Sequence, residues 1–227
     1  LARPAFLVAD DDDVRLPGGA FGFERARQRR IEGGVHARAK IQTPVRRPAR
    51  VLADAAFETR SAAAKNMRFG SAVAWSNPGA DAGSFANPNY AALLEHDCAV
   101  LVPENELKWQ SLQPTNTPHN FTRFDAMLTY AESKGIAMRG HTLLWHQRQW
   151  MPAWLESYSY GATPAAAATE AARILTEHVQ TVVRRYGTRI MSYDVVNEAV
   201  DPATGGLYET ALSQALGGAQ ATLDLAF

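Results

Sequence analysis

The chain has 227 residues, of which 46% are hydrophobic and 20% are charged, and these values suit a globular protein with one sizeable core. Lys and Arg together number 23, as do Asp and Glu, so net charge gives no reason to expect a polyanionic partner. No apolar run approaches the length of about eighteen residues that would predict a membrane span, and the single cysteine, Cys98, excludes a disulfide within the chain.

Residues 1–50 differ in composition from the residues that follow. They hold eleven basic and six acidic residues and show neither helical nor strand periodicity, so we expect a disordered or non-family basic leader. A basic arm that binds an anionic surface is the alternative. Residues 51–227 are expected to form the folded domain, and because they are mildly acidic, nucleic-acid binding is disfavoured.

From residue 51 onward, the sequence predicts helices and strands in alternation. Apolar spacing indicates the helices, short apolar runs indicate the strands, Pro164 is typical of a first helical position, and Gly135 and Gly187 are typical helix stops. The expected helices cover residues 52–65, 89–96, 124–134 and 165–186, with another from 209, and the expected strands cover 68–75, 98–102, 136–145 and 190–196.

This alternation predicts an α/β fold with a parallel sheet, either doubly wound or a barrel. No glycine-rich phosphate-binding loop follows the first strand, which disfavours a nucleotide-binding fold. A (β/α)8 TIM barrel usually needs about 250 residues. We therefore expect residues 51–227 to form such a barrel, truncated after about four βα units.

Polar and aromatic residues gather where three consecutive predicted strands end. In (β/α) barrels the carboxyl ends of the strands build the active site, so we expect these side chains to meet. The second strand is followed by Glu104, Asn105 and Lys108, the third ends with His141 and Trp145, and the fourth ends with Asn197 and Glu198.

These residue types suit carbohydrate chemistry. Aromatic faces stack on sugar rings, polar side chains hydrogen-bond the hydroxyls, and a carboxylic acid can protonate a glycosidic oxygen. A metal site is the rival interpretation, but His141 and His146 are five residues apart and flank a strand end, unlike paired ligands on a helix. No Gly-x-Ser-x-Gly nucleophile elbow is present. We expect no metal and no cofactor.

Three segments resemble those of family 10 glycoside hydrolases, the endo-1,4-β-xylanases. Glu-Asn-Glu-Leu-Lys-Trp stands at 104–109, Arg-Gly-His-Thr-Leu-Leu-Trp-His at 139–146 and Asp-Val-Val-Asn-Glu-Ala at 194–199, in the order and spacing of that family. The resemblance covers residues 51–227 and implies the N-terminal half of a catalytic domain that cleaves xylan with retention of configuration.

The resemblance also implies a role for each residue at the predicted strand ends. Glu198 would be the general acid/base. The sugar at the cleavage point would be bound by Asn197, His141 and Trp145, and the next sugar on the non-reducing side by Glu104, Asn105 and Lys108. The nucleophile of the family lies on a seventh strand, in a Thr-Glu-Leu-Asp-like motif, so we expect residues 1–227 to be inactive alone.

Two departures from the family pattern lie near these motifs. Tyr193 replaces the usual Trp, and the segment from Gln147 to Trp154 is two residues longer, which leaves open whether Gln147 or Gln149 contacts sugar.

We also predict the roles of five side chains that lie near the motifs or on the long helix. We expect packing roles for Trp109 and Trp154, a structural or solvated carboxylate at Glu106, a structural hydrogen bond that involves Asp194, and a surface position for His178.

Other functions remain open beside the xylanase. A β-1,4-glucanase or mannanase of the same clan is one alternative, which Glu104, Asn105 and Lys108 disfavour because they suit an unbranched xylose ring. A non-catalytic sugar-binding fragment is the other. We expect xylan and xylo-oligosaccharides as partners, and a monomer when the domain is complete. Because the polymer is too large to enter a cell, we expect the protein to be secreted or periplasmic.

Overall fold

A computed structural model of the chain describes residues 5–9, 61–76 and 83–227. The expected leader therefore lies largely outside the described residues, as does most of the helix predicted at 52–65, of which residues 61–63 are helical. The three segments that resemble the family and the predicted site residues all fall within the described part.

The order of the parallel strands in the main sheet follows their order in the sequence. Each of these strands is hydrogen-bonded to the next: β2 (Met67–Val73), β3 (Val100–Pro103), β4 (Ala137–Gly140) and β6 (Ser192–Tyr193). Doubly wound sheets reverse their strand order at a switch point, and this sheet does not. The described residues thus form part of a (β/α)8 barrel, as predicted.

The two strands expected at 136–145 and 190–196 are each split into two. After β4 and β6 the chain continues into β5 (Leu144–Trp145) and β7 (Val196–Asn197), which pair in parallel with each other. Polar contacts of Asp194 interrupt the regular ladder: its carbonyl oxygen accepts from Leu143 N at 3.0 Å and from Thr142 Oγ1 at 2.8 Å. The side-chain bond competes with regular strand pairing.

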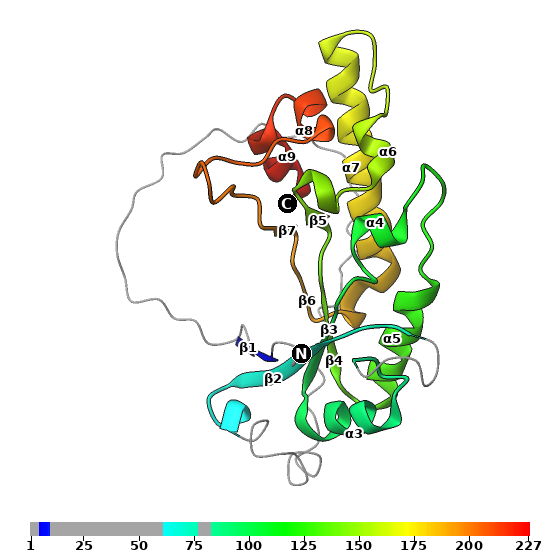
Figure 1. The fold of residues 1–227 in the computed structure, drawn as a ribbon, viewed down its shortest axis with the longest axis vertical. Coiled ribbons are helices and arrows are strands. Elements are labelled where there is room, and N and C mark those ends of the chain that lie inside the picture. Colours follow the sequence, from blue (N-terminus) through cyan, green and yellow to red (C-terminus); the bar gives the residue numbers. More distant parts are fainter. Residues whose placement is uncertain (1–4, 10–60, 77–82) are drawn as a thin grey trace, which may run out of the picture.

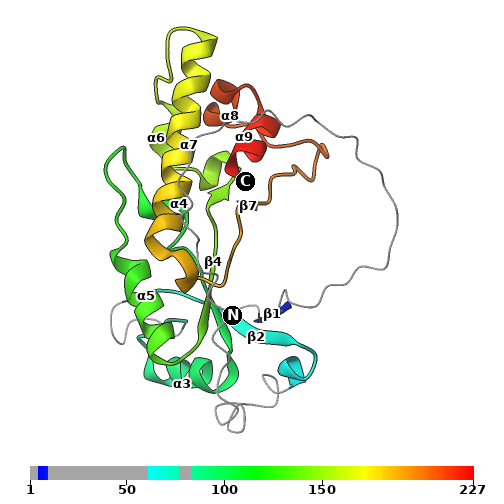
Figure 2. The same ribbon diagram turned by 180° about the vertical axis from the view of Figure 1, so that it is seen from behind.

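Three long helices cover one side of the sheet and connect successive strands. They are α3 (Pro88–Asp97), α5 (Thr122–Ser133) and α7 (Pro164–Tyr186), and Figures 1 and 2 show them along the same side of the strands. Four short elements were not predicted: α4 (Trp109–Leu112), α6 (Ala153–Glu156), and the 3-10 turns η2 (Arg148–Trp150) and η3 (Gly187–Arg189).

Local sequence signals explain where these helices begin and end. The Asn87 side chain accepts hydrogen bonds from the first turn of α3, and Thr163 does the same for α7, which satisfies amides that lack a helical partner. Gly187 ends α7 with φ +51°, a conformation that favours glycine. The single helix expected from residue 209 is two helices, α8 (Ala211–Leu216) and α9 (Ala219–Ala226), because Gly217 and Gly218 both have positive φ.

An antiparallel strand, β1 (Ala5–Ala9), pairs with the free edge of β2, as Figure 2 shows. This strand lies in residues 1–50, for which we predicted no regular secondary structure. The segment is a five-residue apolar run, Ala-Phe-Leu-Val-Ala, next to a stretch of acidic residues. The run is short compared with the polar residues around it, so the composition of residues 1–50 did not indicate a strand. Its partner strand lies some sixty residues farther along the chain.

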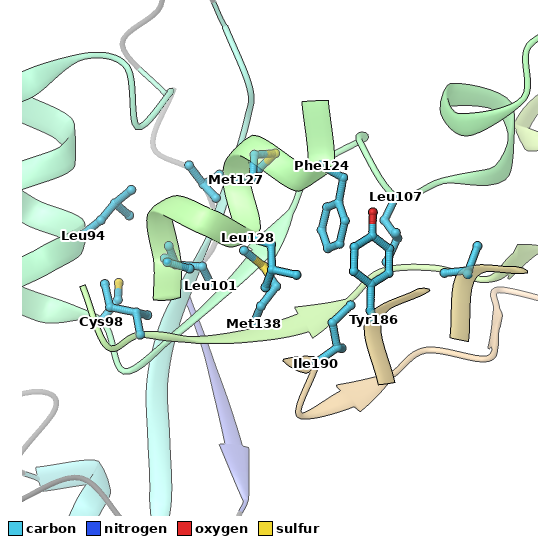
Figure 3. Close-up of a cluster of buried hydrophobic side chains, with 14 of the residues drawn as sticks. Leu94, Cys98, Leu101, Leu107, Phe124, Met127, Leu128, Met138, Tyr186 and Ile190 are labelled. Atoms are coloured by element: carbon cyan, nitrogen blue, oxygen red, sulfur yellow. The ribbon is translucent and has the colours of Figure 1, made fainter. Parts of the chain in front are cut away.

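The main core lies between the sheet and helices α3, α5 and α7. Figure 3 shows Leu101 and Met138 from the strands packed against Phe124 and Leu128 from α5. The Phe124 and Tyr186 rings meet edge to face, with centroids 5.0 Å apart, a favoured geometry for aromatic pairs. Cys98 is buried in the same core, as expected for a small apolar residue.

Gly70 permits the close approach of β2 to β3. A Cβ at this position would lie 2.2 Å from the Val100 carbonyl oxygen and 2.6 Å from Val100 Cγ1. We expect Gly70→Ala to lower the free energy of unfolding by about 2–3 kcal/mol, the usual range for overpacking, as measured by urea denaturation. Gly206→Ala is the control, because its Cβ would make an ordinary contact at 3.5 Å with Thr204 Oγ1. Equal stability of the two variants would contradict the prediction.

Candidate active site

All seven predicted site residues lie at the carboxyl ends of the parallel strands. β7 ends at Asn197 with Glu198 directly after it, and the β5–β7 register places Trp145 opposite Asn197. His141 follows β4. The residues that follow β3 are Glu104, Asn105 and Lys108.

Lys108 links the end of β3 to the end of β5. Its Nζ donates to Asn105 Oδ1 at 2.8 Å and lies 4.5 Å from the centroid of the Trp145 ring. The side chain is buried, and this burial lowers the pKa of the ammonium group, while the charges of Glu104, Glu106 and Glu198 act in the opposite direction. The Lys108 ammonium group, stabilised by carboxylates and an aromatic face, therefore lies among the residues at the strand ends.

Asp194 fixes the orientation of His141. Its Oδ2 lies 3.0 Å from His141 Nδ1, and its Oδ1 accepts from Arg139 Nε at 3.1 Å and from Arg139 Nη2. Burial raises the pKa of the Asp194 carboxyl, but the hydrogen bonds from His141 and Arg139 outweigh this effect and lower it below its ordinary value. A charged Asp194 accepts from Nδ1–H, which leaves His141 Nε2 to contact a ligand. The predicted hydrogen bond of Asp194 is confirmed.

Glu198 is exposed and stands at a backbone position with φ +46°, which is uncommon for a non-glycine residue. Gln147 Nε2 donates to the Glu198 carbonyl oxygen at 3.1 Å and to Glu198 Oε2 at 3.3 Å. Gln149 Nε2 donates in turn to Gln147 Oε1 at 3.2 Å. Of the two glutamines left open by the sequence, Gln147 is thus the one that contacts Glu198.

Sequence reasoning missed Trp150 as a member of this group. Its ring stacks on Trp145 with centroids 4.7 Å apart and planes at 22°, and it lies 5.4 Å from Lys108 Nζ. Trp150 ends the turn η2, within the segment that is two residues longer than the family pattern. That extra length was the one signal in the sequence that could have pointed to it.

Glu106 is a structural carboxylate. It is buried, its Oε1 accepts from Trp75 N at 2.8 Å, and its Oε2 accepts from Asn105 N at 3.0 Å. Trp75 follows the end of β2, whereas Asn105 follows β3. Glu106 therefore connects two adjacent strand ends through backbone amides, which agrees with the structural role expected for it.

The surface position predicted for His178 is wrong. This side chain is 1% exposed, its Nε2 lies 2.9 Å from the Leu143 carbonyl oxygen, and its Nδ1 lies 2.9 Å from His119 Nε2. Its ring stacks on Trp109 with centroids 4.0 Å apart, so the packing role of Trp109 is confirmed. On α7, His178 lies one turn from the buried Val182 and so shares its inward face. Burial lowers the pKa of His178 to about 3.

Two negative findings apply to residues 5–9, 61–76 and 83–227. No group of three or more His, Cys, Asp or Glu side chains in these ranges could hold a metal ion. None of the helices in the same ranges is long and apolar enough to cross a membrane. What these ranges do bring together is an exposed carboxylate beside a cation, aromatic faces and an oriented imidazole.

Comparison with known proteins gives matches at the levels of family, sequence and structure. The model of glycosyl hydrolase family 10 matches residues 59–227. Endo-1,4-beta-xylanase 3 of Hypocrea jecorina is 34% identical over 137 residues, which cover 60% of this chain and 37% of that relative. The chain thus spans about a third of the length of the curated relatives that it matches.

Two solved structures illustrate the structural likeness. Native xylanase 10B from Thermotoga maritima superimposes with a TM-score of 0.58 and 26% identity, covering 70% of this chain and 44% of that one. A variant of xylanase 10C from Cellvibrio japonicus, solved in complex with xylopentaose, gives a TM-score of 0.58 and 26% identity and covers 69% of this chain and 31% of that one.

Proposed function

Because the chain belongs to glycoside hydrolase family 10, we propose that the protein is a retaining endo-1,4-β-xylanase in which Glu198 is the general acid/base. The observation that carries this proposal is the convergence at one end of the sheet of Glu198, Lys108 and Trp145. Xylan is too large to enter a cell, so we also propose that the protein is secreted or periplasmic. We propose that it is a monomer when the domain is complete.

In the proposed mechanism Glu198 acts twice. Its protonated carboxyl first donates to the glycosidic oxygen as the bond to the anomeric carbon breaks, and a second carboxylate about 5 Å away attacks that carbon. Glu198, now ionised, then takes a proton from water as the water displaces the covalent sugar. Gln147 Nε2, which donates to Glu198 Oε2, would hold the carboxyl in place through both steps.

The resemblance implies that the second carboxylate lies on a seventh strand, and the main sheet of the described residues has four parallel strands, β2, β3, β4 and β6. Glu198 would therefore act with a Glu that the described residues do not supply. We propose that residues 1–227 recognise xylo-oligosaccharides without hydrolysing them, because acid catalysis without the nucleophile cannot form the covalent intermediate.

The remaining side chains would bind and orient sugar. Asp194 accepts from His141 Nδ1, so His141 Nε2 would accept a hydrogen bond from a sugar hydroxyl. The Trp145 ring would face the sugar at the cleavage point, beside Asn197. Lys108 and Asn105 are already joined at 2.8 Å and, with Glu104, would bind the hydroxyls of the next sugar on the non-reducing side.

The test is titration calorimetry of purified residues 1–227 with xylotetraose and with cellotetraose, alongside a reducing-sugar assay on xylan. We expect binding of xylotetraose, weaker binding of cellotetraose and no release of reducing sugar. Lys108→Met should weaken xylotetraose binding by about tenfold, because a charged hydrogen-bond donor is removed. Tighter binding of cellotetraose would favour a glucanase, and clear hydrolysis would contradict the need for a second carboxylate that the described residues do not supply.

A further inference from the structure

The segment from Gln147 to Trp154, which is two residues longer than the family pattern, holds Trp150 between two fixed residues. Trp150 N donates to the Gln147 carbonyl oxygen at 2.9 Å, and Met151 N donates to the same oxygen at 3.1 Å. Gln147 in turn contacts Glu198, while the Met151 side chain is buried and packs in a hydrophobic core. The half-buried Trp150 ring is therefore held beside the proposed sugar-binding residues, although the proposed mechanism gives it no role.

Trp150 and Lys108 lie on the same side of the Trp145 ring. The Trp145 centroid is 4.7 Å from the Trp150 centroid and 4.5 Å from Lys108 Nζ. If the two groups lay on opposite faces, nearly the sum of these distances would separate them, but Lys108 Nζ is only 5.4 Å from the Trp150 centroid. One face of Trp145 is thus covered. Because the two indole rings are already at stacking distance, a sugar ring can stack on Trp145 only at its other face.

Trp150 also contributes to the environment of Lys108. The Lys108 side chain is 6% exposed, and its ammonium group lies over both indole rings. An ammonium group is attracted to the face of an aromatic ring, and the attraction is stronger where water is excluded. Trp150 therefore restrains two of the side chains that would bind sugar, Trp145 by stacking and Lys108 by this attraction.

We infer that Trp150 is a positioning residue, which holds Trp145 and Lys108 in their sugar-binding orientations before the substrate arrives. The inference rests on the proposed function, because it takes Trp145 and Lys108 to contact the sugar chain. Ordering a flexible side chain on binding lowers affinity, so a site whose side chains are already fixed binds more tightly. Trp150 acts through its two neighbours and needs no contact of its own with sugar. Two other roles predict different results: a separate platform for a further sugar, and a ring that the sugar must displace from Trp145.

The first test measures the binding of xylobiose and xylotetraose to purified residues 1–227 by titration calorimetry. Xylobiose is long enough to reach both Trp145 and Lys108. We expect Trp150→Ala to weaken the binding of both ligands by about tenfold, because two side chains must then be ordered on binding. Trp150→Phe should bind within about threefold of the parent protein, since a phenyl ring can also stack on Trp145. Leu93→Ala, which shortens an exposed apolar side chain on α3, is the control and should keep the parent affinity. Unchanged affinity in Trp150→Ala would overturn the inference, as would a loss confined to xylotetraose, which indicates a separate platform.

The second test needs no truncation of the ring. Two stacked indole rings couple their electronic transitions, which gives a pair of bands of opposite sign in circular dichroism. We expect this signal in the parent protein and its loss in Trp150→Phe, and we expect it to persist when the parent is saturated with xylotetraose. Absence of the signal from the free parent, or its disappearance on saturation, would overturn the inference alone, because Trp150 would then not remain stacked on Trp145. If the parent shows the signal but binds neither oligosaccharide, the proposed function fails and the inference fails with it.

Discussion

Glu198→Gln, made in the catalytically complete protein, is expected to lower kcat on xylan by about a thousandfold. General acid catalysis contributes about 10²–10⁴ in rate, and a glutamine side chain has no proton of comparable acidity to give the glycosidic oxygen. The amide is nearly isosteric with the carboxyl and can still accept the hydrogen bond from Gln147 Nε2. Substrate affinity should therefore change little, so the loss should appear in kcat and not in KM.

An aryl xyloside with a good leaving group separates this role from a loss of structure. Its aglycone departs without protonation, so formation of the covalent intermediate should be nearly unaffected in Glu198→Gln, and a burst of aglycone should precede slow turnover. Glu177→Gln is the control, because Glu177 is an exposed carboxylate on α7 that forms an ion pair with Arg173. Retention of more than a tenth of the xylan activity in Glu198→Gln would rule out the assigned role.

The features best predicted from the sequence depend on local signals or on strand ends. Helix α7 begins at Pro164 and ends before Gly187, as its start and stop residues indicated. The meeting of His141, Trp145 and Asn197 follows from a general property of parallel barrels, since their carboxyl ends share one rim. Neither prediction needed knowledge of a contact between segments distant in the sequence.

The features that sequence reasoning missed depend on tertiary contacts. Trp150 joined the site through its stack on Trp145, which the spacing of the segment did not reveal. The break between β6 and β7 follows from the hydrogen bonds that Asp194 accepts from residues about fifty positions earlier. His178 is buried by contacts with Leu143 and with His119, which is 59 residues away. A polar residue on a long helix is ordinarily exposed, and only these distant partners make its burial tolerable.

The burial of His178 predicts a strong dependence of stability on pH. Its pKa is about 3 in the folded state because burial disfavours the charged form, against about 6.5 in an unfolded chain. Above pH 6.5 the imidazole is neutral in both states, so it makes no pH-dependent contribution. As pH falls below 6.5, the unfolded state gains a proton that the folded state does not, and the fold loses about 1.4 kcal/mol per pH unit until the folded pKa is reached.

Replacing His178 with Gln should remove that share of the pH dependence. The amide can still donate to the Leu143 carbonyl oxygen, which accepts from His178 Nε2 at 2.9 Å, and it does not titrate. Urea denaturation of both proteins at intervals between pH 6 and pH 4 gives the two slopes, and the slope of the variant should be shallower by about 1.4 kcal/mol per pH unit. This difference is independent of any fixed cost of lost packing against Trp109, which shifts the stability equally at each pH. Parallel slopes for His178→Gln and the parent would show that His178 takes up its proton while folded.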